Sequence, residues 1–277
     1  MGKGDDERRG KTGARILVMV NNKNNRLTRF SDRVENYLRY RPHYPQGVLD
    51  FLFLHNMVKS GSVVADVGSG TGFSARPFLE RNVAVIGIEP NEEMRNASEK
   101  YLSAFPSFLA IDGTAEHTTL VDAAVDAIIA AQAFHWFNID EVIPEFKRII
   151  KPGGYVILMW NDRQVKSSEF LHDYEKLLKK YGTDYHTIDN RNTTDEIIDA
   201  FFIKLSGKKP EKIVFKNSQE FNYEGLKGRL LSSSYVPYPG HEKFESMICD
   251  LEKIFTERSH KGKVKFEYNT NVYVGKV

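Results

Sequence analysis

Short apolar runs alternate with amphipathic stretches along the first part of the chain. The runs are almost continuously apolar, as in strands that are buried on both faces of a parallel sheet. They are residues 63–67, 83–89, 107–111, 125–131 and 155–160. Residues 45–57 and 139–149, which precede two of these strands, carry apolar side chains at helical spacing. The alternation predicts an α/β fold built on a doubly wound, mostly parallel sheet.

The C-terminal part of the chain has a different pattern. Residues 264–274 alternate apolar and polar side chains, which predicts a strand exposed on one face. We expect this strand to pair antiparallel with a sixth strand at 212–221, which gives a seven-stranded sheet with an antiparallel last strand. Further helices are expected at 168–181, 194–205, 223–232 and 241–256.

The chain of 277 residues is long enough for one large domain. Residues 1–26 contain glycines and charges around a short apolar patch, and we interpret them as a disordered leader before a single domain at 27–277. The patch is too short for the apolar core of a secretory signal, and no apolar run approaches the length of a membrane span. We therefore expect no membrane partner.

Charge and cysteine content narrow the function further. The chain has 39 basic and 37 acidic residues, a net charge of +2, which gives no sign of a nucleic-acid partner. The single cysteine, Cys249, excludes an internal disulfide and a cysteine metal cluster. Such a chain fits a reducing compartment. We expect a cytoplasmic monomer without a metal.

A glycine-rich turn follows the first predicted strand. Asp66 lies in that strand, the run Gly-Ser-Gly-Thr-Gly fills residues 68–72, and residues 74–80 have helical spacing. Glycines let a backbone turn sharply and approach a ligand closely. A dinucleotide-binding G-x-G-x-x-G motif needs glycine where this chain has Phe73, and no Gly-Lys-Ser/Thr P-loop follows. The turn therefore predicts a ligand site of another kind at the carboxyl edge of the sheet.

The second strand ends in Glu89, about 20 residues after Asp66. An acidic residue at this place in a doubly wound sheet can accept hydrogen bonds from both hydroxyls of a ribose. The alternative is a solvated glutamate at a strand end. The glycine turn upstream favours the ribose interpretation.

The run Asp-Val-Gly-Ser-Gly-Thr-Gly at 66–72 resembles the first motif of the class I S-adenosylmethionine-dependent methyltransferases. Glu89-Pro90 and the Lys-Pro-Gly-Gly turn at 151–154 are also similar to this family. The run Tyr-x-x-x-Arg-Pro-x-Tyr-Pro at 37–45 resembles a subgroup, the methyltransferase type 11 enzymes similar to trans-aconitate methyltransferase. The resemblance implies the Rossmann-like methyltransferase fold, S-adenosyl-L-methionine as cofactor, and residues 161–209 as a helical cap over the substrate pocket.

The resemblance also implies a set of cofactor-binding residues. The glycine turn holds the amino-acid and ribose parts, Glu89 the ribose hydroxyls, and the turn at 112–116 the adenine. Thr114 stands where the family often has aspartate, so either its hydroxyl or Asp112 is the acceptor. The set is Tyr37, Arg41, Asp66, Gly68, Ser69, Gly70, Thr71, Gly72, Glu89, Pro90, Met94, Gly113, Thr114, Ala115, Glu116 and Gln132.

Two pairs of these residues could also have a purely structural role. Pro90 and Met94 are candidates to pack on the adenine face, although a methionine that opens a helix is more often core. Tyr37 and Arg41 are candidates for the methionine carboxylate, because a guanidinium matches a carboxylate. The alternative is a core tyrosine and a surface arginine.

The substrate pocket is expected where the fourth strand ends, at the switch in strand order. His135 is the candidate catalytic residue, a general base for a hydroxyl acceptor. The favoured alternative is a histidine that orients its loop or caps a helix. Trp136 is expected to form an apolar wall. Tyr235, after Ser232-Ser233-Ser234, is either a pocket residue or part of a plain loop.

The function that we infer is methyl transfer from S-adenosylmethionine to a small molecule, a carboxylate or a hydroxyl compound. A carboxylate needs no base, whereas a hydroxyl needs one. Two alternatives stay open. One is a cofactor-binding protein without transferase turnover. The other is a nucleotide-cofactor oxidoreductase on a similar sheet, which Phe73 disfavours.

Overall fold

The structure is a computed structural model that describes residues 34–183, 185 and 193–277. The predicted leader at 1–26 and most of the polar stretch 185–192 lie outside these residues. The predicted division into a leader and one domain therefore stays a prediction.

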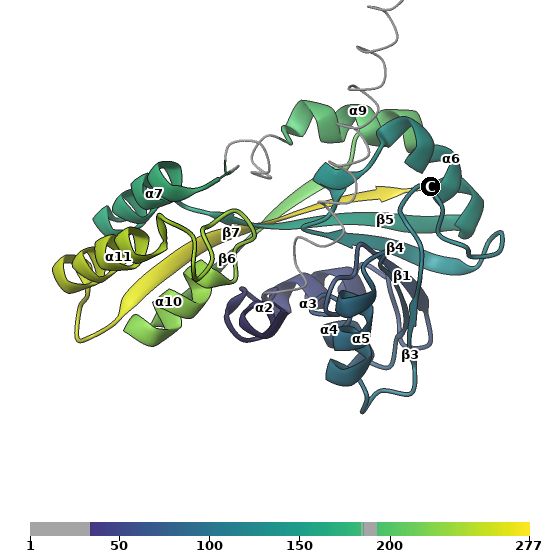
Figure 1. Cartoon of the computed structure of the whole chain (residues 1–277). Coiled ribbons are helices and arrows are strands. Elements are labelled where there is room, and N and C mark those ends of the chain that lie inside the picture. Colours follow the sequence, from purple (N-terminus) through teal and green to yellow (C-terminus); the bar gives the residue numbers. More distant parts are fainter. Residues whose placement is uncertain (1–33, 184, 186–192) are drawn as a thin grey trace, which may run out of the picture.

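Within the described residues, seven strands form one sheet in the order β3-β2-β1-β4-β5-β7-β6 (Figure 1). Strands β1 to β5 are parallel, and β7 pairs antiparallel with both β5 and β6. The doubly wound sheet with an antiparallel last strand is thus confirmed. The strands are β1 (Val63–Val67), β2 (Ala84–Ile88), β3 (Phe108–Ile111), β4 (Val125–Ala131), β5 (Ile150–Arg163), β6 (Glu211–Phe221) and β7 (Val264–Lys276).

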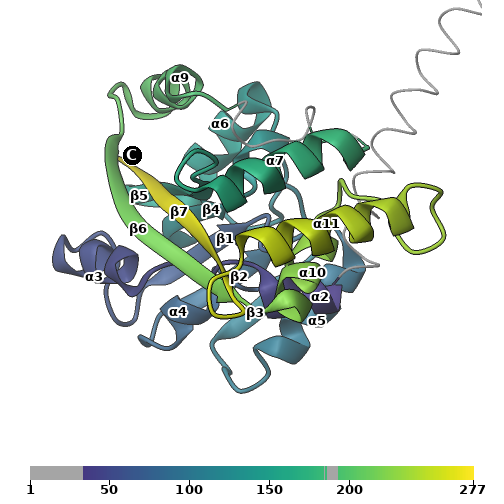
Figure 2. The same ribbon diagram turned by 90° about the vertical axis from the view of Figure 1, so that its left-hand side faces the viewer.

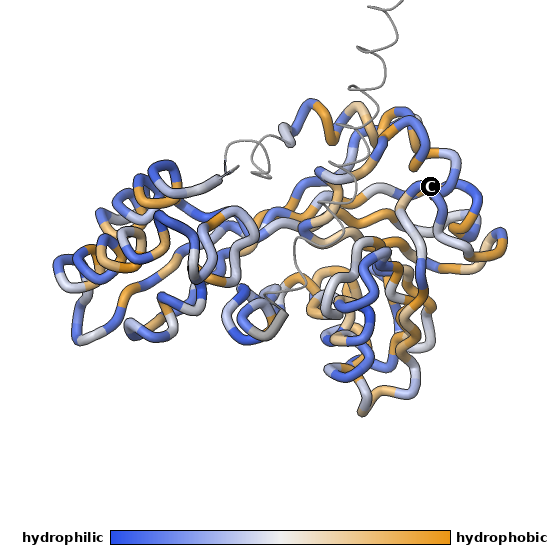
Figure 3. Tube along the Cα trace, viewed as in Figure 1, coloured by the Kyte–Doolittle hydropathy of each residue, from blue (hydrophilic) through white to orange (hydrophobic). Residues whose placement is uncertain are grey.

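Helices cover both faces of the sheet (Figure 1). They are α2 (Val34–Tyr40), α3 (Gln46–Leu54), α4 (Arg76–Leu79), α5 (Glu92–Tyr101), α6 (Ile139–Ile149), α7 (Glu169–Tyr181), α9 (Asp195–Ser206), α10 (Tyr223–Leu231) and α11 (Phe244–Arg258). Side chains alternate along β1, so Val64 packs under α3 and α4 while Ala65 and Val67 pack under α6 and α9. Figure 3 shows the apolar residues concentrated in these strands.

A third core lies beyond the parallel strands, where the long β6–β7 ribbon extends past β5. There α7 and α11 run side by side over the ribbon, and α10 lies beside them (Figure 2). Tyr174 and Phe266 are fully buried between these elements. Two helices of the expected cap at 161–209 thus have different partners, because α7 packs on α11 whereas α9 packs on α6. Their predicted role over a substrate pocket stays a prediction.

Several elements differ in extent from their expected bounds, and two of these differences concern the glycine turn and the Lys-Pro-Gly-Gly turn. The helix after the glycine turn is only four residues long, Arg76–Leu79, rather than 74–80. Strand β5 begins at Ile150, so the Lys-Pro-Gly-Gly turn is part of the strand. Gly153 has φ +79° and donates a 2.9 Å hydrogen bond to the carbonyl of Val277. The end of the chain therefore gives this turn a backbone partner that its local sequence does not reveal.

Candidate active site

The glycine turn lies at the carboxyl end of β1, next to the end of β4, where the strand order reverses. The N–H of Gly68 donates a 2.8 Å hydrogen bond to the carbonyl of Ile88, which ties the turn to β2. Gly68 has φ +72°, and a Cβ there would lie 2.6 Å from the Cβ of Ala133. Glycine is therefore required where the two loops pack together.

Gly70, in contrast to Gly68, has open space where a side chain would be. Its φ is +54°, and a Cβ at this position would meet no atom of the described residues within 4 Å. Its N–H donates to Glu89 Oε2 at 2.9 Å, and the N–H of Asn91 donates to Oε1 at 3.0 Å. Burial raises the pKa of Glu89, although these two bonds oppose the shift. The turn therefore presents an open backbone face beside a carboxylate whose two oxygens can each accept one further hydrogen bond.

Beneath the turn lie buried polar atoms that have no partner among the described residues. Asp66 is 0% exposed; its Oδ2 accepts from the Ser74 hydroxyl at 2.6 Å, and its Oδ1 has no donor. The hydroxyls of Ser69 and Thr71 are buried and likewise unpaired. Buried polar groups are normally satisfied, so this set points to a polar ligand. The open face at Gly70, the Glu89 carboxylate and these atoms fit the ribose and amino-acid parts of S-adenosylmethionine.

We predict that Asp66→Asn stabilises the fold at alkaline pH. Burial raises the pKa of Asp66 from 3.8 to about 7, against the Ser74 hydrogen bond. The carboxylate therefore costs nothing below about pH 3, where both the folded and unfolded states are protonated, and about 4 kcal/mol above about pH 7. Between pH 5 and 8.5 the advantage of the variant in unfolding free energy should grow by about 2–3 kcal/mol, measured by urea unfolding.

Asp140→Asn is the matched control, because its side chain is 83% exposed. Its unfolding free energy relative to wild type should not change between the two pH values. A pH-independent effect of Asp66→Asn would show that this carboxyl titrates normally.

The turn at 112–116 uses its polar groups internally. The N–H of His117 donates to the carbonyl and to the hydroxyl of Thr114, each at 3.2 Å. Glu116 accepts a 2.8 Å bond from the N–H of Asn138 at the start of α6, and Asp112 pairs with Arg95 at 3.1 Å. The Thr114 hydroxyl and the Asp112 carboxylate thus both have protein partners.

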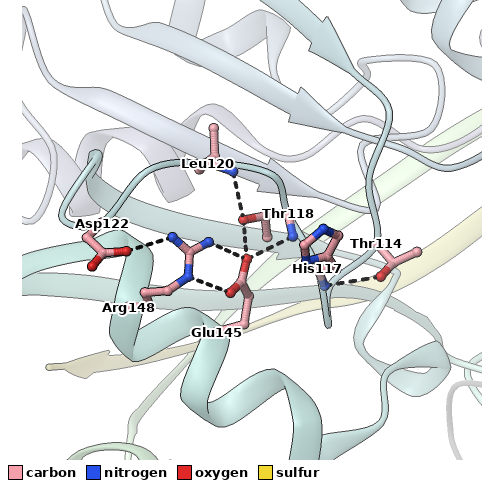
Figure 4. A network of polar contacts seen from close by, with 7 residues as sticks. All are labelled: Thr114, His117, Thr118, Leu120, Asp122, Glu145 and Arg148. Carbon is pink, nitrogen blue, oxygen red and sulfur yellow. Dashed lines mark hydrogen bonds and ion pairs between the residues drawn. The ribbon is translucent and has the colours of Figure 1, made fainter.

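A buried network fixes the other end of this turn (Figure 4). The carboxylate of Glu145 on α6 accepts from the N–H of Thr118 at 2.8 Å and from two nitrogens of Arg148 at 2.8 Å. Asp122 pairs with the same guanidinium at 2.8 Å. The Arg148 hydrogen bond, aided by Thr118 and opposed by burial, lowers the pKa of Glu145 to about 2.

We expect Glu145→Gln to lower the unfolding free energy by about 2–3 kcal/mol at pH 7, since it removes a buried, hydrogen-bonded charge. The folded pKa is depressed, so the stabilisation is present above about pH 4.5 and is lost as the pH falls through 2. Urea unfolding should show the difference from wild type shrinking below about pH 4.5. Asp122→Asn is the control: its carboxylate is 81% exposed, so it should cost less than about 1 kcal/mol. Equal losses for both variants would contradict this account.

A cavity of about 150 Å³ adjoins the glycine turn. It lies between the carboxyl ends of β1, β4 and β5, the segment around α2, and the residues that follow α10. Its lining residues are Tyr37, Arg41, Pro42, Tyr44, Gly68, Ser69, Phe73, Ser74, Ala131, Gln132, His135, Trp136, Asn161, Asp162, Arg163, Tyr185, Arg229, Ser234, Tyr235 and Tyr268. Eight of the predicted site residues therefore line one cavity: Tyr37, Arg41, Gly68, Ser69, Gln132, His135, Trp136 and Tyr235.

The other predicted residues surround the turn or the adjoining ends of β2 and β3, outside this cavity. They are Asp66, Gly70, Thr71, Gly72, Glu89, Pro90, Met94, Gly113, Thr114, Ala115 and Glu116. Met94 is 3% exposed on α5, and Ala115 is buried as well.

The segment around α2 lies against the turn. The Arg41 guanidinium stacks 5.1 Å from the ring of Tyr37, whose edge meets Phe73 at 6.2 Å. Arg41 also donates a 3.0 Å bond to the carbonyl of Ser232. Burial, and next the charge of Arg229, lower the pKa of Arg41. The segment thereby places a guanidinium between the glycine turn and the loop after α10.

The loop after β4 supplies the apolar side of the cavity. Gln132 has φ +58°, an unusual value for a residue with a side chain, and strain of this kind is often found at functional sites. The next turn is the short 3₁₀ helix η2 (Phe134–Trp136), on which the rings of His135 and Trp136 lie 4.8 Å apart. His135 thus lies at the cavity wall at the end of β4, as the sequence predicts.

Several cavity residues were not predicted as site residues. Ser74 is the partner of Asp66, and Asn161 and Arg163 end β5. Arg163 pairs with Glu175 at 2.6 Å, and Arg229 comes from α10. For Arg229 the sequence did contain a signal: an arginine next to apolar residues, as in Gly-Arg-Leu-Leu at 228–231, indicates a buried cation.

Residues 65–158 match the model of the methyltransferase domain family. An uncharacterized methyltransferase of Mycobacterium tuberculosis is 37% identical over 134 residues, which are 48% of this chain and 52% of the relative. The chain thus spans about half the length of this relative. An uncharacterized methyltransferase-like protein of Schizosaccharomyces pombe is 26% identical over 251 residues, covering 89% of this chain and 94% of the relative.

The fold is also similar to solved structures. A proposed type II methyltransferase from Anaeromyxobacter dehalogenans superposes with a TM-score of 0.60 at 20% identity, covering 86% of this chain and 98% of that one. No helix among the described residues has the length and apolar character needed to cross a membrane. The domain match, the relatives and the fold all agree with the methyltransferase-like motif at 66–72 and with Glu89 at the end of β2. Residues 65–158 therefore match a methyltransferase domain, and its motifs resemble those of the class I, S-adenosylmethionine-dependent enzymes.

Proposed function

We propose that this protein transfers a methyl group from S-adenosylmethionine to a small-molecule acceptor, a carboxylate or a hydroxyl compound. The observation that supports it most is the position of Gly70. Its open backbone face lies beside the Glu89 carboxylate, and the same turn borders the cavity through Gly68 and Ser69. A donor bound at the turn would therefore face an acceptor in the cavity.

Each part of the cofactor has a candidate residue in this proposal. Glu89 accepts from the ribose hydroxyls, and Arg41 binds the methionine carboxylate. The unpaired Oδ1 of Asp66 offers a hydrogen-bond acceptor for the ammonium group. The turn at 113–116 holds the adenine through its backbone, because the Thr114 hydroxyl is already engaged with His117.

The bound cofactor supplies a methyl group that its sulfonium already makes electrophilic. The protein therefore needs mainly to align the acceptor and to exclude water. Trp136 and the tyrosines of the cavity wall would exclude water. For a hydroxyl acceptor, His135 at the end of β4 would accept the proton.

The test is turnover with a panel of small carboxylic acids and phenols, followed as S-adenosylhomocysteine released into solution. Release that depends on the added compound, with one methylated product per S-adenosylhomocysteine, supports the proposal. Tight binding of S-adenosylmethionine without release for any compound would instead favour the cofactor-binding alternative.

A further inference from the structure

Arg229 is a buried cation that has no carboxylate partner among the described residues. It is 4% exposed on α10 and lines the same cavity as Gly68. Its Nη1 lies 3.4 Å from the hydroxyls of both Ser232 and Ser233, which are long contacts, and its Nε has no acceptor. Its guanidinium lies over the ring of Phe266 at 5.8 Å. A buried guanidinium without an anion is costly, which points to a ligand that supplies one.

The charges around Arg229 leave the cavity positive. Three arginines line it, whereas Asp162 is the acidic residue among its described lining residues and Glu175 pairs with Arg163. Among these five side chains one positive charge is thus in excess; the carboxyl groups of Asp66 and Glu89 lie outside the cavity, at the glycine turn. The effect reaches Tyr235, whose pKa burial would raise but Arg163, Arg41 and Arg229 together lower.

The cofactor does not remove this excess. S-adenosylmethionine has an ammonium, a sulfonium and one carboxylate, so it adds a further positive charge. Its carboxylate is accounted for by Arg41, which stacks on Tyr37 beside the glycine turn. Asp66 and Glu89 lie beside the turn that holds the cofactor and can offset its positive charge, so the anion for Arg229 would come from the second reactant.

We propose that Arg229 is a specificity-determining residue that binds a carboxylate group of the methyl acceptor. The proposal rests on the methyl transfer proposed above. The planar guanidinium matches a carboxylate in a bidentate pair, and the ring of Phe266 holds its plane in place. Neutral acceptors are disfavoured because they leave this buried charge unpaired.

The experiment measures by calorimetry whether an anion in the cavity strengthens S-adenosylmethionine binding. The probes are succinate, its uncharged diamide succinamide, and inorganic phosphate, at equal ionic strength. Succinate should raise the affinity for S-adenosylmethionine about fivefold, because a carboxylate on Arg229 offsets the added positive charge. Succinamide should have no effect. Equal affinities with and without succinate would overturn the proposal, and so would an effect of phosphate without one of succinate.

The variant Arg229→Gln removes the charge and should abolish the effect of succinate while leaving S-adenosylhomocysteine affinity within about twofold. Arg229→Lys keeps the positive charge but lacks the planar guanidinium that binds a carboxylate with two N–H groups, so it should restore part of the effect of succinate. Parallel weakening of S-adenosylhomocysteine binding in Arg229→Gln would place the cofactor's own carboxylate on Arg229, which overturns the proposal but not the methyl transfer. Thermal melting checks that both variants fold. If neither variant folds, the comparison of succinate with succinamide on the wild-type protein still tests the proposal. Wild-type protein that binds neither sulfur compound would instead contradict the methyl transfer itself.

Discussion

Replacing Glu89 by glutamine is expected to weaken the binding of S-adenosylmethionine and of S-adenosylhomocysteine by about 100-fold. The carboxylate already accepts from the N–H groups of Gly70 and Asn91, and each oxygen keeps one acceptor site for a ribose hydroxyl. Hydrogen bonds to a charged acceptor contribute about 1.5–3 kcal/mol each, and an amide removes one acceptor and the charge. Both ligands share the ribose, so calorimetric titration should show equal losses for the two.

The matched control is Glu99→Gln, because Glu99 is an exposed glutamate on α5. It should leave both affinities unchanged. If Glu89→Gln bound both ligands as tightly as wild type, the carboxylate would only shape the turn through Gly70 and Asn91. The assignment of the ribose hydroxyls to Glu89, at the end of β2, would then be wrong.

Gly70→Ala is expected to lower the affinity for S-adenosylmethionine by about 100-fold while costing only about 1 kcal/mol in unfolding free energy. The new Cβ meets no protein atom within 4 Å, so the stability cost arises from the positive φ of +54° alone. The open space is where the account places the cofactor, which needs close approach of the backbone. Urea unfolding and calorimetric titration of the same sample separate the two effects.

Gly61→Ala provides the control because this glycine also has a positive φ, +83°, and open space around its Cβ. It precedes β1, away from the turn, so it should show a similar stability cost and unchanged affinity. A Gly70→Ala variant that bound the cofactor as well as Gly61→Ala would place the ligand elsewhere.

The parallel sheet could be predicted from the sequence because its strands are buried on both faces. Val63–Val67, Val125–Ala131 and the helix Ile139–Ile149 have the predicted bounds. In these segments the hydrophobic pattern alone determines the structure, since apolar runs between helices have few other places to pack. The start of β5 was missed because its partners are distant in sequence: Ile150 pairs with Val125 of β4, and Gly153 donates a hydrogen bond to Val277.

The cofactor side of the site could also be predicted, because its residues lie in short motifs at strand ends. The acceptor side could not. Arg229 reaches the cavity from α10, which packs on α2, and Tyr268 reaches it from β7, where it pairs with Arg163 at the end of β5. Between α2 and α10 the side chain of Tyr40 occupies the space in which a Cβ on Gly228 would clash at 2.1 Å. Such contacts join residues far apart in the sequence, as between Arg41 and Ser232, which are 191 positions apart.

The account depends most on the identity of the ligand at the glycine turn, which calorimetric titration of ligand-free protein measures directly. S-adenosylmethionine, S-adenosylhomocysteine and NADH are titrated in turn. We predict that both sulfur compounds bind one per chain and that NADH does not, because Phe73 stands where a dinucleotide turn needs glycine. Preference for NADH, or no binding of either sulfur compound by protein that melts cooperatively, would contradict the account.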